Sequence, residues 1–302
     1  MKKITFRTIC FSFVIFISLV QQIQAGEKEA WQALEDKDYQ TAYQEFLPLA
    51  KDGNIAAQHY IGLMYHNGYG VKPDYSQAAL WFNQVINNPG YNIGNPASLE
   101  DPQEAILKLK QFAHEMLCTI YGINNQIGQA ITYDLNKASI HCLAAADKAH
   151  FSEVRFLAGR LYMLGQGVVQ DDGKAFYWYN RSIQEDKYPK SFGALAYLYL
   201  HGKGVPKNVS KAVELALTAA ELNDQYSQIL LSGLYLGGNG ITPNYPKAFF
   251  WSNVVLLHGN LTDALKSQVR TIREEALSHL TPEELATLQK QIFDWRPPSA
   301  GK

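Results

Sequence analysis

The sequence predicts an all-α solenoid, a row of helical hairpins in which each hairpin packs against its neighbours. A residue pattern that recurs along the 302-residue chain predicts this fold class. The pattern runs Tyr65-x-x-Gly68-x-Gly70-Val71-x-x-Asp74, and it starts again at Tyr162, Tyr199 and Tyr235, with steps of 37 and 36 residues between these last three tyrosines. A fixed period of this size is typical of repeat proteins, whose units bury their apolar faces against one another.

Residues 1–25 are expected to form a signal peptide that directs export to the periplasm or the secreted space. Basic Lys2, Lys3 and Arg7 precede an apolar run that ends at Val20, and Ala25 is a small residue at a plausible cleavage point. The alternative is an uncleaved anchor, although the run is short for a membrane span. Cleavage would leave 24 basic and 28 acidic residues, a net charge of −4. This charge argues against nucleic acid as a partner, and we expect no membrane span in the mature chain.

The repeat period, and the segments that depart from it, divide the remaining chain into two caps, a row of repeats and a tail. Residues 26–52 are expected to form an N-terminal capping pair of helices, because Asp38 precedes Asp74 by 36 residues. Five repeats follow over residues 53–259. The second is degenerate, with an insertion at 87–102 that is either an exposed connection or a contact surface. Capping helices over 260–296 close the row, with a capping box at Thr281, and residues 297–302 are expected to be a disordered tail.

Each repeat is expected to be two helices joined by a glycine-containing loop. The paired glycines follow the first helix, where a residue with positive φ is needed, and an Asp or Asn caps the start of the second helix. Small residues three before each Tyr are expected to lie opposite the Ala thirteen after it. The framework positions are Tyr65, Gly68, Gly70, Ala78, Trp81, Tyr162, Gly165, Gly167, Ala175, Trp178, Tyr199, Gly202, Gly204, Ala212, Tyr235, Gly238, Gly240, Ala248 and Trp251.

Two cysteines, Cys118 and Cys142, remain in the mature chain, both in the second repeat. In an oxidising compartment they could form a disulfide, and the alternative is that both are free, buried thiols. The sequence leaves the two interpretations open.

We expect no catalytic residues, no cofactor and no metal. His59 and His66 lie seven residues apart on one predicted helix, but the local sequence supplies no third ligand, and zinc sites have tighter Cys and His spacing. His141 occupies the position of the framework Trp, so packing is its expected role. The acidic pairs near the C-terminus have no neighbouring nucleophile or base.

The residues that vary between repeats indicate where a partner could bind. Positions nine and two before each Tyr lie on one stripe of the first helix, which lines the concave side of tetratricopeptide-like stacks. A single variable residue could equally be an unconstrained surface position. As a set, however, these residues include the aromatic and Arg types that anchor interfaces. The predicted partner-binding residues are Glu153, Phe156, Arg160, Lys190, Tyr197 and Tyr226.

The pattern of Tyr, two Gly, Val or Ile, Asp or Asn, Ala and Trp resembles Sel1-like repeats, which are related to the tetratricopeptide repeat. The resemblance covers roughly residues 27–296. It implies a right-handed α/α superhelix that serves as an adaptor, and in secreted bacterial members roles in the cell envelope, host interaction or virulence. A cysteine-rich branch of the family has a disulfide in each repeat. This chain has one candidate pair, so the penicillin-binding or β-lactamase activity attached to that branch is not transferred to it.

The predicted function is a non-enzymatic scaffold that binds a segment of a protein or peptide, such as an envelope or host protein, in its concave groove. The alternative is an envelope enzyme, or a regulator of an enzyme that acts on peptidoglycan. A glycan hydrolase would need a pair of carboxylates in a cleft, and the sequence spacing offers no such pair.

Overall fold

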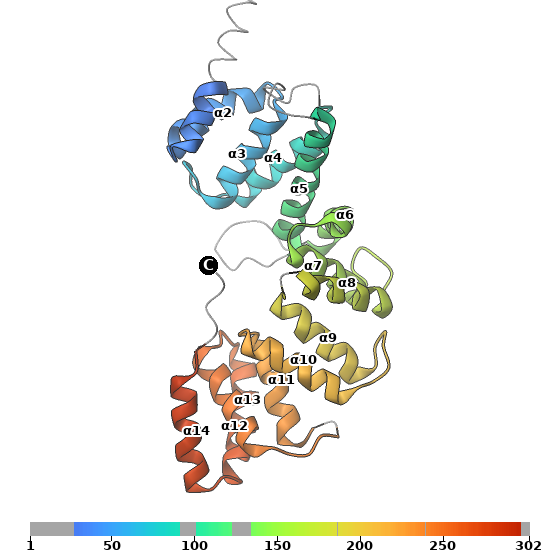
Figure 1. Ribbon diagram of the computed structural model, residues 1–302, viewed down its shortest axis with the longest axis vertical. Coiled ribbons are helices and arrows are strands. Elements are labelled where there is room, and N and C mark those ends of the chain that lie inside the picture. The colour runs from blue at the N-terminus through green and yellow to red at the C-terminus, as the bar shows by residue number, and fades with distance from the viewer. Residues whose placement is uncertain (1–26, 91–100, 123–133, 186, 239, 297–302) are drawn as a thin grey trace, which may run out of the picture. The chain divides into compact units, whose positions relative to one another are not determined.

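The computed structural model describes residues 27–90, 101–122, 134–185, 187–238 and 240–296, in which every regular element is a helix (Figure 1). This confirms the predicted all-α fold class. The predicted signal peptide, most of the insertion, the loop after Tyr121 and the predicted tail lie outside the described residues.

Helical residues 27–35 come first along the described chain. The elements that follow are α2 (Tyr39–Lys51), α3 (Ile55–Asn67), α4 (Tyr75–Asn87), α5 (Pro102–Gly122), α6 (Leu135–Ala145), the 3-10 turn η2 (Ala146–Lys148), α7 (Ser152–Leu164), α8 (Asp172–Glu185), α9 (Pro189–His201), α10 (Val209–Glu221), α11 (Gln225–Gly237), α12 (Tyr245–His258), α13 (Asp263–Ser278) and α14 (Pro282–Asp294).

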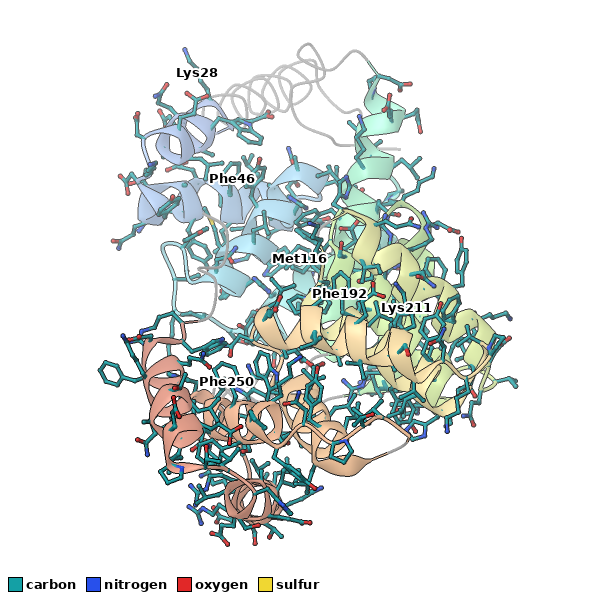
Figure 2. All side chains as sticks on the ribbon, turned by 60° about the horizontal axis from the view of Figure 1, so that its bottom comes forward. Lys28, Phe46, Met116, Phe192, Lys211 and Phe250 are labelled. Carbon is teal, nitrogen blue, oxygen red and sulfur yellow. A yellow bond between two sulfur atoms is a disulfide. The ribbon has the colours of Figure 1, made fainter. Side chains whose placement is uncertain are left out.

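The chain divides into two compact units, Met1–His150 and Phe151–Lys302. Within each unit, helices that follow one another in sequence pack side by side (Figure 1). The ring of Phe46 lies in the core of the first unit, and Phe250 packs against the core of the second (Figure 2). Each core is thus formed along a row of hairpins, as expected for repeats that bury apolar surface against their neighbours.

The predicted caps begin the second helix of every repeat. Asp74 accepts a hydrogen bond from the backbone N–H of Gln77 at 3.0 Å, and Asn208 accepts one from Lys211 at 2.9 Å. The same bond is made by the three remaining caps, Asp134, Asp171 and Asn244. Because these oxygens satisfy N–H groups that have no partner within the helix, their primary role is structural.

A second recurring hydrogen bond closes each loop. The backbone N–H of the cap residue donates to the carbonyl oxygen of the framework Tyr, nine residues earlier in four of the repeats. The degenerate second repeat makes this bond too, from Asp134 to Tyr121 at 3.1 Å, although it lacks the loop glycines. The framework Tyr and the cap therefore define the hairpin even where the sequence between them has changed.

The loop glycines adopt positive φ as predicted, with one exception. Gly202 and Gly204, for example, have φ values of 67° and 66°. In the fifth repeat the prediction for Gly238 is wrong, because its φ is −86° and Gly237 takes the positive value of 131° instead. Other repeats have a residue with a side chain at the position of Gly237, so only this loop can shift its positive φ by one residue.

The small residue three before each Tyr provides space for a side chain of the second helix. A Cβ on Gly159 would lie 2.7 Å from the ring of Tyr179 and 3.2 Å from the carbonyl oxygen of Ala175, so the small residue lies beside the framework Ala as predicted. Phe82 fills the same space beside Gly62. Three other combinations occupy these two positions in the remaining repeats, namely Cys118 with Cys142, Ala196 with Ala216, and Ser232 with Ser252.

Candidate functional site

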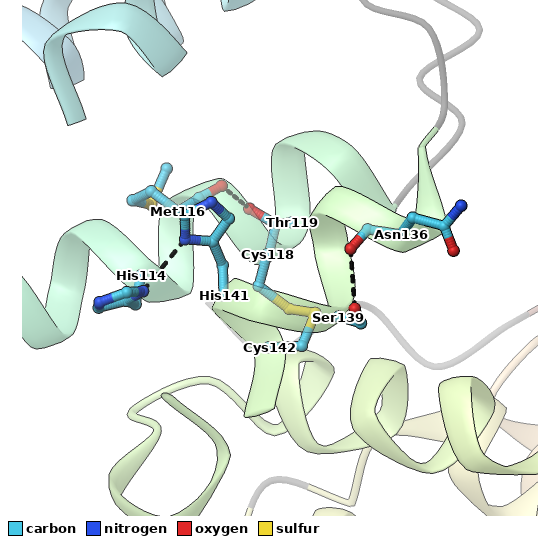
Figure 3. The surroundings of a disulfide bond; sticks show 8 residues. All are labelled: His114, Met116, Cys118, Thr119, Asn136, Ser139, His141 and Cys142. Carbon is cyan, nitrogen blue, oxygen red and sulfur yellow. Dashed lines mark hydrogen bonds between the residues drawn. A yellow bond between two sulfur atoms is a disulfide. The ribbon is translucent and has the colours of Figure 1, made fainter. Parts of the chain in front are cut away.

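Cys118 and Cys142 form a disulfide that links α5 to α6 (Figure 3). Both are fully buried. They occupy the positions that Gly159 and the ring of Tyr179 take in the third repeat. Of the two interpretations left open by the sequence, the structure shows the bonded one. Because disulfides persist in oxidising compartments, the bond indicates an extracytoplasmic location.

His59 and His66 each contact aromatic rings. The ring of His59 is buried 4.9 Å from Phe112 and 5.4 Å from Tyr60, and His66 lies 5.2 Å from Tyr75. Burial lowers the pKa of His59 to about 4. Over the described parts of the chain, no group of three or more His, Cys, Asp or Glu side chains is arranged to hold a metal ion.

His141 stacks on the framework Tyr121, with ring centres 6.0 Å apart, and its Nδ1 lies 3.1 Å from Nδ1 of His114 (Figure 3). Burial, and then the neighbouring His114, lower the pKa of His141 to about 4, while burial also lowers the pKa of His114. His141 therefore packs at the Trp position as predicted, but the pairing with His114 gave no signal in the sequence.

These histidines predict a loss of stability of the first unit in acid. A histidine whose pKa is lowered by folding binds a proton more readily in the unfolded chain. Protonation therefore stabilises the unfolded state relative to the folded state as the pH falls below about 6.5. The effect of His59 should grow until the pH reaches its folded pKa of about 4. We expect the urea concentration at the unfolding midpoint of the first unit to decrease as the pH is lowered from 7 to 4.5.

His59→Phe is the variant that isolates the contribution of His59 to this pH dependence, since a ring of similar size can contact the same aromatic neighbours without titrating. Urea denaturation of the native chain and the variant at matched pH values measures the difference. An equally steep decline for both proteins would contradict this assignment.

The predicted partner-binding residues all lie on the first helices of repeats in the second unit. Glu153 and Arg160 are on α7, Lys190 and Tyr197 on α9, and Tyr226 on α11. This placement assembles the predicted set within one compact unit.

The ring of Phe156 on α7 is partly buried rather than fully exposed. It packs against the core of the second unit, with its ring centre 5.6 Å from that of Tyr179 and 5.3 Å from that of Tyr188. Packing explains its aromatic character, so we leave Phe156 out of the proposed binding surface.

Tyr188 holds the predicted binding residue Glu153 in place, and the sequence analysis did not identify it. Its hydroxyl donates to Glu153 Oε1 at 2.7 Å, so the residue before α9 is tied to the first turn of α7. Burial, followed by the charge of Glu153, raises the pKa of Tyr188. Tyr188 is neither nine nor two residues before a framework Tyr, so the pattern of variable positions did not include it.

Three predicted residues of α9 and α11 are exposed. Tyr226 is 74% exposed, Tyr197 is 38% exposed, and Lys190 is also on the surface. The ring of Tyr197 lies 4.4 Å from His201, and Lys203 Nζ lies 5.4 Å from its centre. The equivalent position on α11 is Gly233, and a Cβ there would have no atom within 4 Å. We call Glu153, Arg160, Lys190, Tyr197 and Tyr226 the variable stripe.

Among the helices of the described residues, none combines the length and apolar character that a membrane span requires.

These features define the class of the protein as an all-helical repeat protein with a recurring framework and a variable surface. The Sel1 repeat model matches residues 55–85, 153–186, 194–224 and 225–253. These four segments identify Sel1 repeats in the chain. The second repeat is absent from the matched segments, in agreement with its degenerate sequence.

Two curated proteins are similar over part of their length. A segment of 85 residues, 28% of this chain, is 36% identical to the ERAD-associated E3 ubiquitin-protein ligase component HRD3B of Arabidopsis thaliana, and it covers 13% of that protein. An uncharacterised protein of Neisseria meningitidis serogroup B is 25% identical over 82% of this chain and 52% of its own length. The chain thus spans about half the length of the Neisseria protein and a much smaller part, 13%, of the Arabidopsis protein.

Among solved structures, a Sel1 repeat protein from Oxalobacter formigenes is similar in fold. It aligns with a TM-score of 0.59 and 21% sequence identity, covering 87% of this chain and 96% of that one. At this level of identity the similarity supports the fold alone.

Proposed function

We propose that this protein is a non-enzymatic binding scaffold of the periplasm or the secreted space, which holds a segment of a partner protein against the variable stripe. One observation carries the proposal: the Tyr, Ala and Trp side chains of the framework are buried or half-buried, whereas Lys190, Tyr197 and Tyr226 at the non-repeating positions are exposed. An exposed aromatic and charged set without a role in packing is the composition expected of an interface.

The Sel1 repeat matches support the binding role in this proposal, and the disulfide supports the export. Sel1 repeats match four segments of the chain, and one curated relative is by name a component of an E3 ubiquitin-protein ligase, that is, of an assembly. The disulfide and the basic, then apolar, N-terminal sequence support export. An exported repeat protein has envelope and extracellular proteins as its available partners.

The proposal predicts that Tyr226→Ala weakens partner binding. Tyr226 is 74% exposed and can contribute a rigid ring to an interface without having a role in the core. We expect at least a tenfold loss of affinity, about 1.4 kcal/mol, with the free energy of unfolding unchanged to within about 0.5 kcal/mol. Site-specific photo-crosslinking from positions 197 and 226 in the producing cell would identify the partner, and a binding titration would measure the loss.

Tyr177 of α8 provides the matched control, because it is also an exposed tyrosine, at 51%, but lies on the second helix of its repeat. A crosslinker at position 177 should not capture the protein captured from positions 197 and 226, and Tyr177→Ala should bind normally. Capture from position 177 alone, or full affinity in both Tyr226→Ala and Arg160→Ala, would contradict the proposed surface.

The alternative of an envelope enzyme, or of a regulator of a peptidoglycan-acting enzyme, has no specific observation in its favour within the described residues. Incubation of the purified protein with cell-wall material tests its catalytic form, and release of a soluble fragment would support it.

A further inference from the structure

The two helices that the disulfide joins also bring together two imidazole rings. His114 of α5 and His141 of α6 face each other through their Nδ1 atoms, 3.1 Å apart (Figure 3). The rings are inclined at 42°, with centres 5.2 Å apart. Other repeats have different residues here, with Gln58 and Trp81 in the first and Arg155 and Trp178 in the third.

The separation of the two nitrogens matches the bite of a transition-metal ion. Imidazole nitrogens bind such ions at about 2.0–2.1 Å. Two nitrogens on one ion therefore lie about 2.9 Å apart at a right angle and about 3.3 Å apart at a tetrahedral angle, and the observed 3.1 Å falls between these values. We propose that His114 and His141 form a two-histidine site for a late first-row divalent metal ion, with copper(II) as the tightest-binding member of the class.

The protein holds the pair in place before any ion binds. His141 is adjacent in sequence to Cys142, and His114 lies about one helical turn before Cys118, so the disulfide limits how far the two rings can separate. Tyr121 stacks against His141 and restrains its ring plane. Such preorganisation lowers the conformational entropy lost when both ligands are engaged.

The proton shared by the two rings must leave Nδ1 before a metal ion can bind there. A metal ion binds an imidazole nitrogen that carries no proton. In the metal-free pair one Nδ1–H donates to the other Nδ1. Binding moves the proton of the donor ring to its Nε2 through solvent, so two neutral rings become two Nδ1 ligands with no net release of protons.

The choice of ion follows from the ligand set. Imidazole suits copper, nickel and zinc, and affinities for a given site increase towards copper(II). In the described chain no third His, Cys, Asp or Glu completes the site, so water would occupy the remaining positions. A tetragonal copper(II) ion accepts such a mixture of nitrogen and water ligands.

Titration of the oxidised, full-length mature protein with copper(II) sulfate tests the site. We expect one copper(II) ion per chain, with nitrogen coordination in its electron paramagnetic resonance spectrum. The double variant His114→Gln/His141→Gln should bind at least tenfold more weakly. His201→Gln is the matched control, because His201 is an exposed histidine of the second unit, and it should leave the affinity unchanged.

Footprinting of the native chain keeps the test valid if the double variant misfolds. Diethylpyrocarbonate modifies accessible imidazoles, and peptide mass spectrometry identifies the modified residue. Copper(II) should protect His114 and His141 and leave His201 reactive. Unchanged modification of the pair in the presence of copper(II), or native affinity in a folded double variant, would overturn the proposal.

Discussion

Cys118→Ala/Cys142→Ala is expected to lower the free energy of unfolding of the first unit by about 3 kcal/mol. The disulfide closes a loop across 24 residues, and an open chain of that length has many more unfolded conformations. The fourth repeat indicates that alanine itself fits here, because Ala196 and Ala216 occupy the equivalent positions and are fully buried. Chemical denaturation followed by probes in each unit measures the loss, which should be confined to the first.

Reduction of the native protein is the control for this variant. Dithiothreitol should lower the stability of the native chain by a similar amount and leave the double alanine variant unchanged. A loss smaller than about 1 kcal/mol on breaking the bond would show that the cap-to-tyrosine hydrogen bond and the packing of α5 on α6 hold this hairpin without it.

The recurring part of the fold could be predicted from the sequence because it depends on local chemistry. Asp74 and its equivalents cap helices through their own side chains, and Gly202 supplies a positive φ that other residues adopt at a cost. Both requirements operate within a few residues, so they recur at fixed positions. The degenerate repeat retained the residues of the closing hydrogen bond, Tyr121 and Asp134, together with Ile127, Lys137 and Ala138, and this set was sufficient to locate its hairpin.

Features that depend on contacts between helices could not be predicted in the same way. The disulfide, the ring contacts of Phe156 and the meeting of His114 with His141 each depend on which faces of two helices pack together. A signal for the disulfide existed: Cys118 and Cys142 occupy the two positions where Gly159 makes room for Tyr179. Recognising it requires knowing that these positions touch, which the repeat pattern does not state.

Gly204→Ala is expected to destabilise the second unit by about 3 kcal/mol, for two reasons that act together. Gly204 has a φ of 66°, and a residue with a side chain loses about 1–2 kcal/mol in this conformation. Its added Cβ would also overlap the carbonyl oxygen of Asp172, where the loop rests on the first turn of α8. Because backbone atoms of a helix cannot rotate away, the loop must shift, which adds about 1–3 kcal/mol. Thermal and urea denaturation measure the loss.

Gly240→Ala separates the two contributions. Gly240 also has a positive φ, 87°, but a Cβ there would meet no atom within 4 Å, so only the backbone contribution of about 1–2 kcal/mol should remain. The difference between the two variants then measures the close contact between successive repeats. Equal losses would mean that the second glycine of the loop serves the turn alone, whereas a larger loss for Gly204→Ala would show that it sets how closely one repeat approaches the next.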